Sequence, residues 1–330
     1  RVMEDYDVGV ISLPTRNLSY LLVEAAVKSG LDLVDILEDY HRRPDPVELE
    51  GIKVPEDMSL NDYGEDLHQR ARKNGVTILD GMGFAPGLSN ITLGDGVSRM
   101  DQAETAVARV GGIPSKASAD RFPLKYITTW AFEHVLRLYS INTQLIKDGK
   151  VVEVSSLSDR ESFGLDQVGI QENLEGAVTP GMPSFIHTRP NLSEFSEKTI
   201  RWPGHYQAID VLKECGLLDL NPVKVQGAAL SPREFLAAVL QDKLSPREND
   251  RDVCVMYNTV TGRVNGQEAR IDYYLWEESD QENKISAMGR VTGYPAAIGA
   301  KLIGQGIISE KGIVPPEDGI KGKVYDQFLK

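Results

Sequence analysis

The chain has 330 residues, of which 41% are hydrophobic and 26% charged, a composition typical of a globular protein with about two domains. A formal net charge of −13 argues against nucleic acid as a partner, and no apolar run is long enough to span a membrane. No signal peptide is evident, Cys215 and Cys254 lie far apart, and the five histidines lack metal-ligand spacing. We therefore expect a cytoplasmic protein with reduced thiols and no metal site.

The first hundred residues alternate between short apolar runs and amphipathic stretches. We expect strands over 7–13, 31–36 and 77–80, and helices over 17–28 and 62–73. Asn17 is the expected N-cap of the first helix, and Gly30 fits the C′ position that ends it. Strand–helix alternation without hairpin turns is typical of a parallel, doubly wound sheet.

After about residue 100 the pattern changes to antiparallel signals. Strand 104–112 is followed by a helix within 126–140 and by a hairpin over 143–154. A longer hairpin is expected over 252–278, because Asn-Gly pairs supply the positive φ angles of tight turns. Residues 291–306 are rich in small side chains and predict a helix that packs closely on the first part of the chain.

Residues 81–90, GMGFAPGLSN, look at first like a dinucleotide-binding fingerprint. That fingerprint requires GxGxxG after the first strand and an acidic residue roughly 20 positions later. Here Pro86 stands at the third glycine position, Gly87 comes one residue late, and the segment follows the third strand. We interpret it as a strand-end crossover, with Pro86 as the first residue of a helix and Gly81 and Gly83 permitting close backbone approach.

Several motifs occur in an order that resembles the saccharopine dehydrogenase family. They are DVGVISLP (7–14), GMGFAPGLSN, TTW (128–130), IKDGKVVEV (146–154), TIRWPGH (199–205) and RVTGYPAA (290–297). The RWPGH and RVTG motifs are the most specific, and together with GLSN they are most similar to the L-lysine 6-dehydrogenase branch. The resemblance is weak over 41–60 and about 218–250.

The resemblance implies a NAD- or NADP-dependent oxidoreductase that acts on a carbon–nitrogen bond of an amino acid, most like L-lysine 6-dehydrogenase. It also implies a glycine-rich loop before residue 1. Two alternatives remain open: a reductase of the saccharopine or carboxynorspermidine dehydrogenase type, and a non-catalytic dimeric binding protein without a working cofactor site.

We therefore expect an α/β protein with an N-terminally truncated Rossmann-type sheet and a mixed α/β domain. Residues 1–100 would form the partial dinucleotide-binding domain, with 290–330 packing back on it. Residues 101–289 would form the substrate-binding and dimerisation domain. The long hairpin 252–278 could build a shared sheet, so a homodimer is expected.

Hydride transfer requires the nicotinamide near the carboxyl ends of parallel strands. The resemblance and this geometry place the cofactor at Leu13, Pro14, Gly81, Gly83, Pro86 and Gly87. The alternative is that these residues only end strands and form turns.

An amino-acid substrate requires a cation for its carboxylate, and arginine is preferred because it binds carboxylates through two parallel hydrogen bonds. Arg201 and Arg290 are the candidates, with structural salt bridges as the alternative. His205 is the candidate general acid/base, or else a helix cap, and Asp35 is a second catalytic candidate at a strand end. The remaining substrate-binding candidates are Trp130, Thr292 and Asn90.

Overall fold

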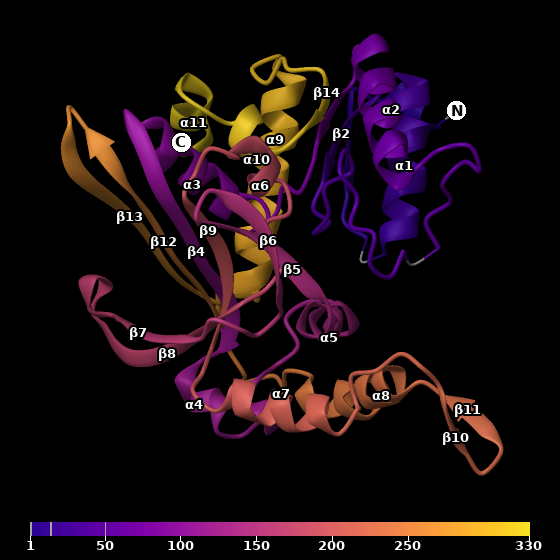
Figure 1. Ribbon diagram of the computed structural model, residues 1–330, viewed down its shortest axis with the longest axis vertical. Helices are drawn as coiled ribbons and strands as arrows, with labels where there is room; N and C mark the ends of the chain where they lie inside the picture. The colour runs from indigo at the N-terminus through magenta and orange to yellow at the C-terminus, as the bar shows by residue number, and fades with distance from the viewer. Residues whose placement is uncertain (1, 14, 50) are drawn as a thin grey trace.

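The computed structural model describes residues 2–13, 15–49 and 51–330, and it contains two larger sheets and a small hairpin (Figure 1). The first sheet is entirely parallel in the order β1–β2–β3–β14, as its strand–helix alternation predicted. Its strands are β1 (Val8–Ile11), β2 (Asp32–Asp35), β3 (Thr77–Leu79) and β14 (Gly312–Val314).

Helices cover both faces of this sheet. On one face, α1 (Arg16–Ser29) and α2 (Leu60–Lys73) bury apolar side chains against Leu33 and Ile78. On the other, α9 (Ala287–Gly304) and α11 (Lys323–Phe328) pack with Val34 and Leu79. The expected return of the small-residue helix to the first sheet is thus confirmed, and α9 also contacts the second sheet.

Two helix starts differ from the expectation. Thr15 occupies the N-cap position of α1 without a side-chain capping hydrogen bond, and Asn17 lies inside the first turn, so the predicted Asn17 cap is wrong. The helix starts earlier because Arg16 is buried and its guanidinium donates to Asp39. Gly30 ends the helix with φ 79°, as expected, whereas α2 begins after Ser59, whose hydroxyl accepts from the backbone N–H of Asp62.

The second sheet has eight strands and mixed directions. Strands β4 and β9 are parallel, while the other pairs in this sheet are antiparallel. Both expected hairpins are present, with Asp148 and Asn265 at positive φ. The strands are β4 (Gln102–Pro114), β5 (Asn142–Lys147), β6 (Lys150–Ser155), β7 (Glu161–Leu165), β8 (Ile170–Val178), β9 (Glu194–Arg201), β12 (Asp252–Val264) and β13 (Gln267–Glu278).

Helices α5 (Phe132–Ser140), α7 (His205–Glu214) and α8 (Pro232–Leu244) share one apolar core. Of these, α7 and α8 lie at the bottom of Figure 1. A small hairpin, β10 (Val223–Val225) with β11 (Ala228–Leu230), projects beside them. The short elements are η1 (Val2–Asp5), α4 (Lys116–Ala119), η2 (Pro123–Lys125), η3 (Asp166–Val168), α6 (Phe185–Thr188) and α10 (Pro316–Gly319). Within the described ranges, no helix has the length and apolar character needed to cross a membrane.

Helix α3 (Leu88–Ser98) leaves the first sheet directly after the GMGFAP segment. Its N-cap is Gly87, and Pro86 lies before the cap. The prediction that Pro86 is the first residue of the helix is therefore wrong. The reason is the turn itself: Gly83 and Gly87 form an isolated β-bridge, so the chain closes a tight loop before the helix begins.

Candidate functional site

A cavity of about 370 Å³ lies where the carboxyl ends of β1 and β2 face strands β4 and β9 of the second sheet. The segments that line it come from far apart in the sequence: 12–13, 36–38, 83–86, 110–112, 129–139, 197–201 and 286–292. Most of the lining is apolar, which limits the water that can reach a bound ligand.

The cavity brings together six of the residues expected at the site. Leu13, Gly83 and Pro86 stand on the side expected for the cofactor, at the strand ends of the first sheet. The expected substrate-binding residues Trp130, Arg201 and Thr292 line the same space. The indole of Trp130 lies 5.4 Å from the imidazole of His134, measured between ring centroids.

Arg201 is the main cation of this cavity, and only 3% of its surface is exposed. Its Nε donates to the Tyr139 hydroxyl over 2.8 Å, and its Nη1 donates to the carbonyl of Ile200 over 2.8 Å. The guanidinium also lies 5.0 Å from the centre of the Tyr126 ring. No carboxylate of the described chain lies within ion-pair distance of Arg201, so its charge is available for an anionic ligand.

His205 lies behind this arginine and does not line the cavity. Its Nε2 is 3.1 Å from the Tyr139 hydroxyl, and its Nδ1 is 2.8 Å from the carbonyl of Leu124. Since Tyr139 accepts from Arg201, its hydroxyl proton points to His205 Nε2, and the imidazole carries its own proton on Nδ1. Burial, reinforced by the charge of Arg201, lowers the pKa of His205 to about 3. This geometry gives His205 a positioning role rather than direct contact with substrate.

Two expected substrate-binding residues lie outside the cavity. Arg290 is partly exposed, and its Nη1 pairs with Glu277 over 3.1 Å, which is the salt bridge considered as its alternative. Asn90 is buried, where its amide N–H donates to Ser184 and to Glu317. Neither side chain is among those that line the cavity.

The remaining glycines of the GMGFAPGLSN segment shape its turn. Gly81 has φ 71°, and a Cβ there would lie 3.0 Å from the Pro86 ring. Gly87 has φ 129°, and a Cβ there would lie 1.9 Å from the carbonyl oxygen of Gly83. Both positions therefore exclude side chains for local reasons, and neither lines the cavity. Pro14, the other expected cofactor contact, lies outside the described residues.

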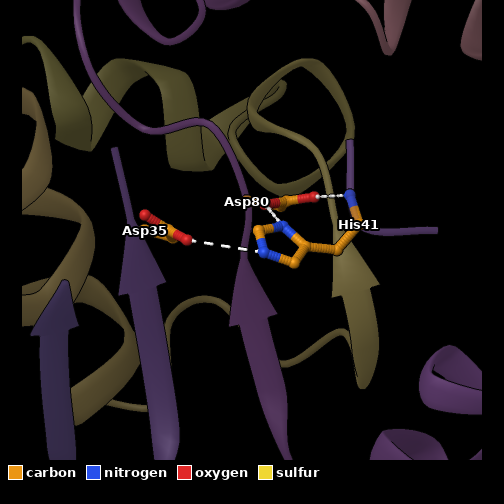
Figure 2. A group of neighbouring side chains, drawn as sticks. All are labelled: Asp35, His41 and Asp80. Atoms are coloured by element: carbon orange, nitrogen blue, oxygen red, sulfur yellow. Dashed lines mark hydrogen bonds and ion pairs between the residues drawn. The ribbon is translucent and has the colours of Figure 1, made fainter. Parts of the chain in front are cut away.

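Asp35 belongs to a buried network at the ends of β2 and β3 and does not line the cavity (Figure 2). The imidazole of His41 lies between two carboxylates, with Nδ1 2.7 Å from Asp80 Oδ1 and Nε2 3.7 Å from Asp35 Oδ2. Ser19 completes the network through a hydroxyl that contacts Asp35 and His41. The Leu37 backbone N–H donates to Asp35 Oδ1. The network therefore fixes the position of a loop that lines the cavity.

The charges in this network are strongly coupled. Burial opposes a charged imidazole, but Asp80 and Asp35 outweigh it and raise the pKa of His41 to about 9. Burial also raises the pKa of Asp35 to about 6 despite the nearby imidazolium. The three residues offer ligand atoms within 4.8 Å of one another, yet both ring nitrogens of His41 already contact protein groups. The contacts favour a hydrogen-bonded ion network that ties together α1, β2 and β3.

The cavity also contains two carboxyls that sequence reasoning missed: Glu197, which is buried, and Glu38, whose side chain is 8% exposed. Glu197 lies on β9 with Thr199 and Arg201, and all three face the cavity. A usable signal was present, because residues at i, i+2 and i+4 of a strand point to the same face. No comparable pattern marks Glu38, which follows β2 in an irregular segment.

The residues present fit the nicotinamide end of the expected cofactor. A Cβ at Gly83 would lie 3.3 Å from both the Pro86 carbonyl oxygen and the Thr292 methyl, so only glycine leaves this surface open. The neighbouring Leu13 and Phe84 supply an apolar wall for a flat ring. The sequence carries no GxGxxG motif for the pyrophosphate, so the fit concerns the nicotinamide end alone.

Comparisons with known proteins identify the family of this chain. The family described as Saccharopine dehydrogenase C-terminal domain matches residues 83–330. The NADP(+)-dependent, L-glutamate-forming saccharopine dehydrogenase of Pyricularia oryzae is 22% identical, over 80% of this chain and 73% of that protein. The carboxyaminopropylagmatine dehydrogenase of Synechocystis is also 22% identical, over 96% of this chain and 76% of the relative.

Solved structures match the fold. The apo saccharopine dehydrogenase (L-Glu forming) of Saccharomyces cerevisiae has a TM-score of 0.73 at 18% identity, covering 99% of this chain and 82% of the other. The homospermidine synthase of Legionella pneumophila, solved with NAD, has a TM-score of 0.55 at 11% identity, covering 98% and 72%. The expected Rossmann-type α/β fold and the family resemblance are confirmed, and the chain belongs to the saccharopine dehydrogenase family of oxidoreductases.

Proposed function

We propose that this protein oxidises a carbon–nitrogen bond of an amine that also carries a carboxylate, with NAD or NADP as the hydride acceptor. The observation that carries this proposal is Arg201, a buried guanidinium with no carboxylate partner among the described residues. Arg201 lines the same cavity as Gly83, beside which we place the nicotinamide ring. The names of the relatives, which include an NADP(+)-dependent dehydrogenase, support the cofactor.

The side chains of the cavity have separate roles in binding the substrate and the cofactor. Arg201, held by Tyr139 and the Ile200 carbonyl, binds the substrate carboxylate and fixes its orientation. Trp130 and Leu138 cover the aliphatic part of the substrate and exclude water. When bound, the nicotinamide supplies the hydride acceptor, and Gly83 leaves room for its ring.

L-lysine is the substrate proposed first, on the strength of the RWPGH and RVTG motifs. Release of the aldehyde from the resulting imine would then require water. A second candidate is a conjugate in which the amine nitrogen joins two chains, as in saccharopine or a carboxylated polyamine. It is favoured by a second cavity, which shares Glu38, Leu138 and Glu197 with the first.

We also propose a homodimer in the cytoplasm. Strand β13 is the outer strand of the second sheet, and an open strand edge of this length can pair with another copy. Two free cysteines, Cys215 and Cys254, suit a reducing compartment. Sedimentation velocity of the purified protein tests the dimer, and a monomer at all concentrations would contradict it.

The substrate proposal is tested by a panel of amines with both cofactors. We expect reduced nicotinamide to accumulate with L-lysine, saccharopine or carboxyaminopropylagmatine. Turnover of a conjugate without turnover of L-lysine would remove the lysine proposal. Failure of every amine, with ligand binding intact, would favour the alternative of a non-catalytic binding protein.

A further inference from the structure

A second cavity of about 450 Å³ adjoins the first. It is lined by the loop that follows β2, by helix α5, by β5 and by residues 178–183. Glu38, Leu138 and Glu197 line both cavities, so these side chains mark the junction between them.

Glu197 is buried at this junction, with 4% of its surface exposed. Its Oε2 accepts from the Thr179 hydroxyl over 2.6 Å and from the Gly181 backbone N–H over 3.0 Å. In the described part of the chain, no donor reaches its Oε1, and no arginine or lysine lies within ion-pair distance. The open oxygen of this buried carboxyl faces both cavities and is available to a donor on a ligand.

Glu38 adds a second carboxyl to the junction. Its Oε2 lies 3.4 Å from His134 Nε2, and its side chain is 8% exposed. The arginines that line the second cavity already have acidic partners: Arg43 pairs with Glu65, and Arg137 pairs with Asp45. Arg137 also stabilises the charged form of Glu38, so within the described chain Glu197 is the junction carboxyl without an arginine partner.

We propose that Glu38 and Glu197 bind the substrate's ammonium nitrogen at the junction, and that the second cavity receives a distal, cationic arm attached to that nitrogen. This inference rests on the proposed function and deepens it, because it favours the second candidate substrate, a conjugate whose amine nitrogen joins two chains, over L-lysine. One arm ends in a carboxylate at Arg201, and the other extends past Glu197 into the second cavity. Like-charge repulsion disfavours an anionic distal arm there.

Binding of an ammonium ligand at this junction is coupled to the release of a proton from Glu197. Burial, with a contribution from Glu38, raises the pKa of Glu197 to about 8, and burial also raises the pKa of Glu38. The other charged or titratable groups acting on this pair are Asp39, His134, Arg137 and Arg201. Near neutral pH the empty Glu197 is mainly protonated, and an ammonium ligand favours its carboxylate, so binding breaks the O–H bond and releases that proton to solvent.

The same carboxylate can then serve the oxidation. The ammonium must lose a proton before its carbon can give up a hydride. The N–H bond breaks, the electron pair stays on nitrogen, and a new O–H bond forms at Glu197 Oε1. Glu197 is thus the proposed proton acceptor, and Glu38 holds the charge of the amine in place.

Isothermal titration calorimetry of the purified protein tests the proposal without turnover. Carboxyaminopropylagmatine serves as the probe with a cationic arm and saccharopine as the probe with an anionic arm, each in two buffers of different ionisation enthalpy. Near pH 7 we expect the protein to release about 1 proton for each molecule of the cationic-arm probe bound. This release should vanish above about pH 9. We expect it to bind at least about tenfold more tightly than saccharopine.

Matched variants test whether Glu197 is the group that releases the proton. Glu197→Gln should abolish proton release and weaken the cationic-arm probe at least about tenfold. Glu194→Gln, on the same strand but outside both cavities, should change neither quantity. If Glu197→Gln does not fold, Thr179→Val replaces it as the test. Removing that hydrogen bond should move the proton release to higher pH, and an unchanged profile would count against the proposal.

Several results would overturn the inference. Binding without proton release, release that persists in Glu197→Gln, preference for saccharopine, or no binding of either probe would each do so. A different result would contradict the proposed function alone: amines bind with proton release, but no amine in the panel reduces NAD or NADP.

Discussion

Arg201 and Arg290 stand in the two most specific motifs, yet their surroundings differ sharply. Arg201 is buried in the cavity, whereas Arg290 forms a partly exposed pair with Glu277. Arg201→Ala should raise the KM for a carboxylate-bearing amine about 10- to 100-fold, because a charged hydrogen-bonded contact is lost. Arg290→Ala should change KM less than about twofold, since exposed ion pairs contribute little. Steady-state kinetics of both variants checks this, and equal effects would contradict the assignment.

The raised pKa of His41 predicts how the free energy of unfolding depends on pH. Its pKa is raised in the folded protein to about 9, so the stabilisation is fully present below its ordinary value near 6.5 and is lost as pH rises through 9. The free energy of unfolding should fall by on the order of 3 kcal/mol between about pH 6.5 and 10. Urea denaturation across this range measures it.

The control for this prediction is His41→Gln. Without an imidazole, the variant should lack most of this fall in stability, because the group that loses its proton between about pH 6.5 and 10 is absent. The difference between the two proteins isolates His41 from the other groups that titrate in the same range. Parallel curves for the protein and the variant would contradict the account of the network.

At this scale the sequence predicted part of the site. The sequence singled out Arg201 because it stands in a specific motif and because a substrate carboxylate requires a cation, and the structure places it in the cavity. Asp35 was placed at a strand end, but nothing local indicated that His41 returns from the loop to bury it. Glu197 was overlooked although its spacing from Arg201 places both on one face of β9.

The loop between β3 and α3 shows how tightly one element can constrain its residues. Gly87 has φ 129° and no space for a Cβ, which would lie 1.9 Å from the Gly83 carbonyl oxygen. Gly87→Ala should lower the free energy of unfolding by roughly 3 kcal/mol or more, since strain and a backbone clash add. Gly75→Ala, at φ 68° with open space around it, should cost about 1 kcal/mol. Chemical denaturation compares the two, and equal losses would contradict the account.

Elements with strong local signals were predicted well. The hairpins at Asp148-Gly149 and Asn265-Gly266 follow from turn chemistry, and the end of α1 follows from Gly30. The start of α1 was misplaced because the tertiary burial of Arg16 overrides the capping preference of Asn17. Strand β14 has only three residues, and its parallel pairing with β3 depends on contacts that no local pattern reveals.

At the scale of the whole molecule, function depends on how the two sheets meet. Helix α9 packs on both sheets, and its first turns bring Met288 and Thr292 to the cavity beside Gly83. The sequence predicted the return of this helix and the parallel sheet. It could not predict the paired cavities, because their walls come from segments that approach only when both sheets are assembled.

In the proposed reaction, the cavity oxidises a carbon–nitrogen bond of an amine that Arg201 holds through its carboxylate. The most direct test of this reaction is nicotinamide reduction by the purified protein, with each amine of the panel and both NAD and NADP, in parallel with Arg201→Ala. We predict that at least one carboxylate-bearing amine reduces the cofactor and that Arg201→Ala loses most of this activity at low substrate concentration. No reduction with any amine, or an Arg201→Ala variant as efficient as the natural protein, would contradict the claim.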